Sequence, residues 1–186
     1  MPLADRTKWD GLYRASAPLF TPSPILEGLD AVLPRRGRAL DLAGGTGRNA
    51  LALAQRGLDV TLADISPFGL ELAGAEAERT GLQLSTVAVD FEEDPPPAGP
   101  WDLILVFHYL HRPLFTLYPT LLAPGGLLVV VHPTRSNLER HSKPGPRFLL
   151  DDGELPGLVP SLEIVQYDEG WHDDGRHEAR LVARRA

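Results

Sequence analysis

The chain has 186 residues and no cysteine; 43% of the residues are hydrophobic, 23% are charged, and the formal net charge is −7. This length predicts one domain with a buried core, and the lack of cysteine excludes disulfides, thiolate metal sites and thiol nucleophiles. The negative charge argues against a long nucleic acid as partner. Without an 18-residue apolar run or a signal-peptide start, we expect no membrane partner and a cytoplasmic location.

The first predicted element is a helical N-terminal cap. Residues 1–36 carry Trp9 and Tyr13 and precede the first apolar strand, so we expect them to cover one end of a sheet. Residues 37–186 form the predicted core, and the whole of 1–186 is predicted to be a single domain.

Apolar runs then alternate with helical segments. Five runs are predicted to be buried strands: 38–42, 58–63, 82–89, 101–107 and 127–131. Three intervening segments have apolar residues three and four apart and are predicted to be helices: 49–56, 67–79 and 113–122. Buried strands that alternate with helices predict a parallel sheet covered on both faces.

The pattern changes near the end of the sequence. Segments 162–167 and 178–183 alternate apolar and polar residues, and Asp173-Asp174-Gly175 between them is a turn signal. These segments predict an antiparallel pair. The fold class is therefore α/β: a Rossmann-like doubly wound sheet of seven strands, mostly parallel, with an antiparallel C-terminal pair and helices on both faces.

A glycine-rich loop follows the first predicted strand and opens a helix. Its sequence is Asp41-Leu42-Ala43-Gly44-Gly45-Thr46-Gly47-Arg48-Asn49. Glycines there let backbone N–H groups approach a ligand closely, and a helix N-terminus favours negative charge. The segment from Gly45 to Ala50 also satisfies the dinucleotide fingerprint G-x-G-x-x-A, which alone does not name the ligand.

Three carboxylates stand at or near the ends of three predicted strands. Asp41 precedes the glycines, where a carboxylate repels a pyrophosphate and attracts an ammonium group. Asp64 is placed to accept hydrogen bonds from ribose hydroxyls. Asp90 with Phe91 offers an acceptor for an exocyclic amine beside an aromatic face. Each of these three acids could alternatively cap a helix or stabilise a turn. Together, the three acids predict one ligand bound along one edge of the sheet.

These motifs resemble those of the class I S-adenosylmethionine-dependent methyltransferases. The resemblance covers nearly the whole chain and rests on 41–47, 64–67, 89–91 and 122–126. One position departs from the family pattern D/E-x-G-x-G-x-G, because Ala43 stands at its first glycine. Within the class, the chain is similar to small bacterial enzymes of the tellurite-resistance and thiopurine methyltransferase type. That narrower likeness rests on 9–13, 47–49, 110–113, 147–150 and 153–155.

The resemblance implies S-adenosyl-L-methionine as cofactor and S-adenosyl-L-homocysteine as product. The methionine part would be wrapped by the loop residues Ala43, Gly44, Gly45 and Gly47. Asp41 would lie near the ammonium group, and Phe107 would offer its backbone carbonyl beside the methionine amine. Trp9 and Tyr13 would close the site from the cap; packing of an amphipathic helix is the alternative for both.

The resemblance also implies the residues that hold the nucleoside. Asp64 would bind the ribose diol, and Ile65 would pack on the adenine. Asp90 with Phe91 would hold the far edge of the adenine.

The predicted chemistry is an in-line methyl transfer to a small-molecule acceptor. The cofactor supplies the reactive carbon, and the protein supplies alignment, exclusion of water and, where needed, a base. A thiolate, selenide or telluride needs no base at neutral pH, whereas an alcohol or a protonated amine does. His108 and His132 each directly follow a predicted strand at the active edge, so they are the candidate bases or substrate-orienting residues. The alternative is a hydrogen bond to a nearby backbone carbonyl.

The sequence also bears on metal sites and on functions other than small-molecule methylation. No metal site is predicted, because the histidines lack a third ligand at zinc spacing and no H-E-x-x-H occurs. The sequence after residue 106 lacks the [D/N]-P-P-[aromatic] motif of base-amine methylation. An NAD(P)-binding oxidoreductase, a non-catalytic S-adenosylmethionine-binding module and a protein methyltransferase remain alternatives. The oligomeric state and a lid role for 133–147 are left open.

Overall fold

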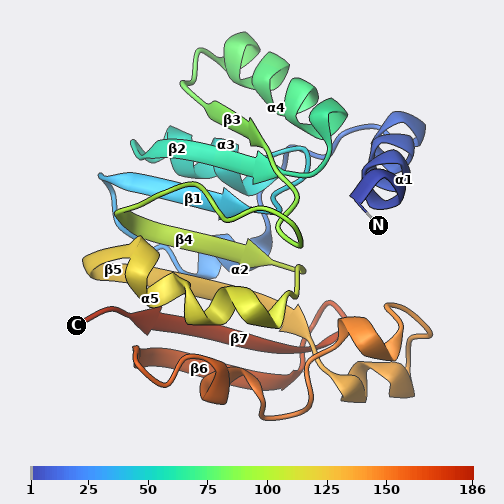
Figure 1. Ribbon diagram of the computed structural model, residues 1–186, viewed down its shortest axis with the longest axis vertical. Coiled ribbons are helices and arrows are strands. Elements are labelled where there is room, and N and C mark those ends of the chain that lie inside the picture. Colours follow the sequence, from blue (N-terminus) through green and yellow to red (C-terminus); the bar gives the residue numbers. More distant parts are fainter. Residues whose placement is uncertain (1) are drawn as a thin grey trace.

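A seven-stranded sheet forms the centre of the molecule in a computed structural model, which describes residues 2–186 (Figure 1). The strands lie in the order β3-β2-β1-β4-β5-β7-β6. Their bounds are β1 Arg38–Leu42, β2 Asp59–Asp64, β3 Ser85–Ala88, β4 Trp101–Phe107, β5 Leu122–Pro133, β6 Glu163–Trp171 and β7 His177–Arg184. The first five strands pair in parallel, and β7 runs antiparallel to both β5 and β6. The predicted fold class is confirmed.

Helices cover both faces of this sheet. The α-helices are α1 Pro2–Ala15, α2 Pro24–Gly28, α3 Arg48–Gln55, α4 Pro67–Thr80 and α5 Tyr118–Leu121. Four short 3-10 helices are η1 Arg112–Thr116, η2 Arg135–Glu139, η3 Pro146–Phe148 and η4 Leu155–Leu158. The single helix predicted over 113–122 is wrong: η1 and α5 share this segment, because Pro119 lacks the N–H that a continuous helix needs.

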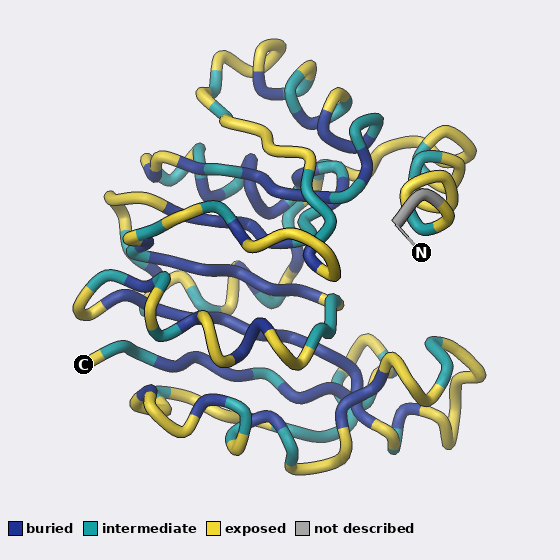
Figure 2. Tube along the Cα trace, in the orientation of Figure 1, coloured by how far each residue is buried: buried dark blue, intermediate teal, exposed yellow. Residues whose placement is uncertain are grey.

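Side-chain alternation along the buried strands builds a core on each face of the sheet. In β4, Ile104 and Val106 pack into one cluster with residues of η1, α5 and η4. Leu103, Leu105 and Phe107 of the same strand pack into the other cluster, with residues of α2, α3 and α4. Figure 2 shows the central strands as buried and the outer sides of the helices as exposed. This double cover explains why the parallel strands are continuous apolar runs.

The carboxyl ends of β1, β2, β3 and β4 lie at one edge of the sheet. In Figure 1 their arrows point toward the side on which α1 stands, and the segment that follows β5 reaches the same side. The predicted site residues that follow these strands are thereby gathered at one edge.

Candidate functional site

The glycines of the loop between β1 and α3 are packed too closely to be replaced by residues with side chains. A β-carbon on Gly44 would stand 2.5 Å from Leu62 Cδ1 and 2.6 Å from Asp41 Cγ, and one on Gly47 would stand 2.8 Å from Ala73 Cβ. Gly47 also has a φ of 79°, and Gly45 has a φ of 61°, a left-handed conformation that glycine adopts without strain. The glycines therefore form a bare backbone cradle at the start of α3.

Ala43 has the same left-handed backbone conformation although it is not a glycine. Its φ is 55°, so an alanine occupies the left-handed region at the position where the family pattern has glycine. Its N–H donates to the carbonyl of Ala63 at 2.8 Å, which ties the loop to β2. The cradle thus keeps its shape with one strained residue.

Asp41 places a buried carboxylate beneath the cradle. The residue is 1% exposed, and its Oδ2 is buried with no hydrogen-bond partner among the residues that the structure describes. Burial raises the pKa of Asp41 to about 7; the backbone N–H of Ala50 opposes this shift, and the nearby Asp64 carboxylate adds to it. An unpartnered carboxylate oxygen in this position fits a cationic hydrogen-bond donor.

Asp64 lies at the end of β2, next to the same loop. Its Oδ2 accepts the N–H of Gly45 at 2.8 Å, and its Oδ1 accepts the N–H of Ser66 at 2.9 Å. Burial raises the pKa of Asp64, and these two backbone hydrogen bonds oppose that shift. Each carboxylate oxygen can accept a second hydrogen bond, so the two oxygens can still receive the paired hydroxyls of a ribose. Ile65 follows it and is partly exposed at this edge.

The predicted pair Asp90 and Phe91 splits into a turn and a core residue. Asp90 Oδ1 accepts the N–H of Glu92 at 3.0 Å and so closes the turn after β3. The ring of Phe91 is only 5% exposed and packs within the core, so it does not form an open aromatic face. Tyr109 contacts that ring, at 5.9 Å between ring centroids, and is the partly exposed aromatic side chain here. Tyr109 is not among the predicted site residues; its only signal in the sequence is its place directly after His108.

Helix α1 is held against the start of α4. Asp10 accepts hydrogen bonds from the Ser66 hydroxyl and, at 3.2 Å, from the N–H of Phe68. The Ser66 hydroxyl in turn accepts the N–H of Gly69 at 3.0 Å and caps α4. Tyr13 projects from this docked helix over the cradle, whereas Trp9 stacks on Tyr13 and remains 39% exposed.

His108 follows β4 and is paired with a buried glutamate. Its Nε2 lies 2.8 Å from Oε1 of Glu178, which is fully buried on β7. Burial raises the pKa of Glu178, but the hydrogen bonds from His108 and Arg180 outweigh it, and the pKa falls to about 2. Arg176 adds a guanidinium 3.7 Å from the same carboxylate oxygen. Glu178 is not among the predicted site residues; its signal in the sequence is an acidic residue at the start of an otherwise apolar-rich strand.

His132 is placed differently from His108. It is 3% exposed, its Nε2 lies 2.7 Å from the carbonyl oxygen of Phe148, and its Nδ1 is buried without a partner among the described residues. Burial lowers the pKa of His132 to about 4, although the hydrogen bond to Phe148 opposes the shift. The buried neutral ring connects β5 to η3 and does not reach open space. The alternative role, a contact to a backbone carbonyl, is the one that the structure gives it.

The segment after β5 packs against the β6–β7 hairpin. The guanidinium carbon of Arg140 lies 3.7 Å from the ring centroid of Trp171, and His141 Nε2 lies 2.8 Å from the carbonyl oxygen of Gly175. Within residues 2–186, no group of three or more His, Asp or Glu side chains is arranged to bind a metal ion. None of the described helices is both long enough and apolar enough to cross a membrane.

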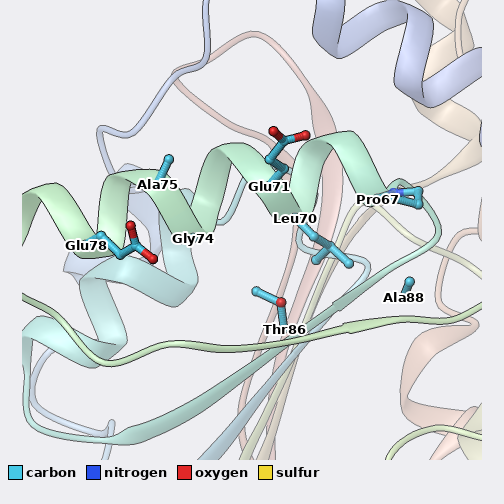
Figure 3. Close-up of a pocket in the computed structure, with 8 residues that line it drawn as sticks. All are labelled: Pro67, Leu70, Glu71, Gly74, Ala75, Glu78, Thr86 and Ala88. Atoms are coloured by element: carbon cyan, nitrogen blue, oxygen red, sulfur yellow. The ribbon is translucent and has the colours of Figure 1, made fainter.

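A separate hollow of about 560 Å³ lies between α4 and β3 (Figure 3). It is lined by Pro67, Leu70, Glu71, Gly74, Ala75, Glu78, Thr86 and Ala88. None of the predicted site residues lines it. Two of its lining residues, Pro67 and Ala88, are close in sequence to Asp64 and Asp90, so this hollow adjoins the candidate site.

The central part of the chain is similar in sequence to methyltransferases. Residues 39–126 match a family described as "Methyltransferase domain". A demethylmenaquinone methyltransferase from Thermus thermophilus is 39% identical over 102 residues, which are 50% of this chain and 46% of that protein. A ribosomal protein L11 methyltransferase from Thermus thermophilus is 34% identical over 115 residues, or 60% of this chain and 45% of that protein. The chain thus spans about half the length of the curated relatives it matches.

Solved structures extend the likeness to nearly the whole fold. TehB from Haemophilus influenzae aligns with 97% of this chain and 67% of its own, with a TM-score of 0.72 and 20% identity. The magnesium protoporphyrin IX methyltransferase ChlM from Synechocystis PCC 6803, solved with bound SAH, aligns with 88% of this chain and 80% of its own. Its TM-score is 0.69 and its identity 16%. At these identities the comparison establishes a shared fold.

Proposed function

We propose that this protein transfers a methyl group from S-adenosylmethionine to a small molecule, because residues 39–126 match a methyltransferase-domain family and the chain shares the fold of TehB and of the SAH-bound methyltransferase ChlM. One observation carries the proposal: a bare glycine cradle lies between two buried carboxylates, and Asp41 Oδ2 has no partner among the described residues. A nicotinamide dinucleotide would bring its pyrophosphate to this loop, where the buried Asp41 opposes it.

The residues at the edge fit the parts of this cofactor. Asp41 would accept the ammonium group, Gly44 and Gly45 would pass under the methionine part, and Asp64 would accept the ribose hydroxyls. Tyr109 and Ile65 would border the adenine. The bound cofactor supplies a methyl carbon activated by the positive charge on sulfur. The protein supplies the position of that carbon and the exclusion of water.

The acceptor side would lie along His108, where β4 ends. The net charge of −7 supports an acceptor other than a nucleic acid. The tellurite-resistance and thiopurine type is the subtype that the motif likeness favours, and the fold shared with TehB supports it. A protein acceptor is the second candidate, because one matched relative carries the name of a ribosomal protein L11 methyltransferase.

Calorimetric titration with S-adenosylhomocysteine, with NADH in a parallel titration, tests the cofactor. We expect micromolar binding of S-adenosylhomocysteine and none of NADH. Asp64→Asn should weaken S-adenosylhomocysteine binding at least tenfold. The carboxylate offers two charged acceptor oxygens to the ribose hydroxyls, whereas the amide offers one neutral acceptor oxygen. Asp59→Asn, at the exposed start of the same strand, is the matched control and should bind normally. Binding of NADH alone, or of neither compound, would overturn the proposal.

Incubation with radiolabelled S-adenosylmethionine distinguishes the acceptor classes. Cell extract is separated into a protein fraction and a filtrate of small molecules, and each is supplied to the enzyme. Label that enters the filtrate supports a small-molecule acceptor. Label that enters only the protein fraction would contradict a small-molecule acceptor and support a protein acceptor.

A further inference from the structure

His108 has an unusual backbone conformation at the end of β4. Its φ is 59°, which is uncommon for a residue other than glycine and costs free energy. The backbone is held there by the N–H of His108, which donates to the carbonyl oxygen of Val131 at 2.8 Å. Its ring is 30% exposed, whereas the side chain of its partner Glu178 is fully buried. Strained residues of this kind persist where the surrounding structure fixes them, and they are common at functional sites.

The partner of His108 determines which ring nitrogen carries the hydrogen. Glu178 is ionised and its oxygens can only accept, so Nε2 at 2.8 Å must be the donor. The lone pair of the neutral ring is then on Nδ1. This is the arrangement of a histidine that can take a proton while a buried carboxylate stabilises the resulting imidazolium.

The charged groups around His108 and Glu178 have opposite effects on the protonation of His108. Glu178 favours a protonated His108, whereas Arg176, with Nη1 at 3.4 Å from His108 Nε2, disfavours it. Arg180 donates to Glu178 Oε2 at 3.2 Å, and the neutral His132 faces the pair from β5. Arg180 therefore satisfies the second oxygen of Glu178 and leaves the first for His108.

From this geometry we propose that Glu178 is a positioning residue for His108, and that His108 Nδ1 accepts a proton from an acceptor bearing an O–H or N–H group. The inference rests on the proposed function, but it names an acceptor with an O–H or N–H group in place of the soft anionic acceptors of the tellurite-resistance and thiopurine subtype. As the acceptor oxygen or nitrogen bonds to the methyl carbon, its proton passes to Nδ1, and the carbon–sulfur bond breaks with its electron pair left on sulfur. The imidazolium later releases the proton to water. An acceptor that is already anionic, such as a thiolate, needs no such pair.

Nitrogen-15 NMR of the histidine rings tests the pair directly, and it does so without turnover. In the parent protein, free and with S-adenosylhomocysteine, His108 should be in the Nε2-protonated tautomer. In Glu178→Gln the tautomers should mix, since the amide can present either its carbonyl oxygen or its N–H to Nε2. Glu163→Gln, an exposed glutamate of the same hairpin, is the matched control and should leave the spectrum unchanged. An Nδ1-protonated ring in the parent, or an unchanged His108 in Glu178→Gln, would overturn the positioning role.

Acceptor probes test the second half of the proposal. Phenol and benzylamine are protonated at pH 8, whereas thiophenol is anionic there. Transfer to phenol or benzylamine should fall about 100-fold or more in His108→Asn, and transfer to thiophenol should change little. Transfer confined to thiophenol, equal transfer by the variant, or transfer to none of the three counts against this acceptor class. Failure of S-adenosylhomocysteine to bind would instead refute the proposed function, and the NMR spectrum would still decide whether Glu178 orients His108.

Discussion

The hydroxyl of Tyr13 lies directly over Gly45, the central glycine of the loop between β1 and α3. A β-carbon built on Gly45 would stand 2.5 Å from that oxygen, and one built on Gly69 would stand 3.0 Å from the Tyr13 ring. Gly45 of this loop and Gly69 of α4 thus leave the space that one aromatic side chain of α1 fills. Helix α1, the cradle and the start of α4 therefore pack as one unit.

Gly45→Ala should disrupt this unit. The new methyl group meets Tyr13, and the left-handed φ of 61° costs an alanine about 1–2 kcal/mol. We expect at least a tenfold loss of S-adenosylhomocysteine affinity by calorimetry, together with lower stability in urea. Gly74→Ala, which faces open space within α4, is the control and should be neutral or stabilising. Normal affinity in Gly45→Ala would contradict the close packing.

Asp10→Ala should release α1 from α4. The substitution removes the acceptor for the Ser66 hydroxyl and for the N–H of Phe68, contacts comparable to a helix cap worth about 1 kcal/mol. We expect faster cleavage by a protease within residues 16–22. Leu12→Ala, on the same helix and 48% exposed, should keep the parental cleavage rate. Equal rates for the Asp10 variant and the parent would indicate that other contacts hold α1.

Ala43→Gly should stabilise the protein. A left-handed alanine costs about 1–2 kcal/mol, whereas the added chain entropy of glycine in the unfolded state costs about 0.5–1 kcal/mol. The expected net gain is about 0.5–1 kcal/mol in urea unfolding, with unchanged or tighter binding of S-adenosylhomocysteine. A loss of stability would mean that the Ala43 methyl group makes packing contacts worth more than the strain.

Binding of the cofactor product should depend on pH through Asp41. Burial raises the pKa of Asp41 to about 7 in the free protein, and an ammonium group beside it favours the carboxylate. Binding should therefore release a proton near neutral pH, and affinity for S-adenosylhomocysteine should rise about tenfold from pH 6 to pH 8. Calorimetry in buffers of different ionisation enthalpy measures that proton. In Asp41→Asn both the proton release and the pH dependence should be absent, and a parental pH profile in this variant would contradict the assignment.

The buried His132 should make the protein less stable in acid. Its pKa of about 4 in the folded state lies below the 6.5 of an exposed histidine, so between these values the unfolded chain binds more protons. The free energy of unfolding should fall as the pH drops from 6.5 to 4, by up to about 3 kcal/mol from this residue.

The variant His132→Gln isolates this contribution. Glutamine can place an N–H near the position of Nε2, but it does not titrate in this range. Asp41 acts in the opposite direction between its unfolded pKa of 3.8 and about 7, because its folded state binds the proton more readily. The informative quantity is therefore the difference between parent and variant, measured by urea unfolding at pH 4.5 and pH 6.5. A constant difference would argue against a buried neutral His132.

The central strands of the sheet were predictable because they carry their environment in their sequence. β1 and β4 are covered on both faces and are mostly apolar and buried, as predicted. The alternation predicted for the C-terminal pair is not seen in the burial, because β6 is exposed or half-buried along its length and β7 is mostly buried. The helix predicted over 113–122 failed at Pro119, where the local rule for proline outweighs the apolar spacing. The buried strand predicted over 82–89 is wrong in two respects: only Ser85–Ala88 pairs with β2, and these four residues of β3 are exposed because β3 is the edge strand.

The site was predictable only in part, and the reason is sequence distance. Gly45 of the cradle and Asp64 are joined by a hydrogen bond and are only 19 residues apart in the sequence. Each of them belongs to a short motif that can be recognised in the sequence. Glu178 lies 70 residues from His108 and sits in a strand where an acidic residue is expected to face water. Its burial follows from the position of β7 between β5 and β6, which no local pattern encodes.

The antiparallel pairing of β5 with β7 has a consequence for the acceptor side. At the far edge of the sheet, Arg185 donates its N–H to the carbonyl of Gly126 at 2.9 Å and accepts the N–H of Gly125 at 2.8 Å. Side chains alternate between the faces of a strand, so a slip of β7 by one residue would turn Glu178 away from His108. The backbone bonds of Arg185 extend the register of β7 against β5 past Arg184, and at the other end of the same register Glu178 is paired with Pro133. The alignment of β7 with β5 therefore decides whether His108 has a carboxylate partner.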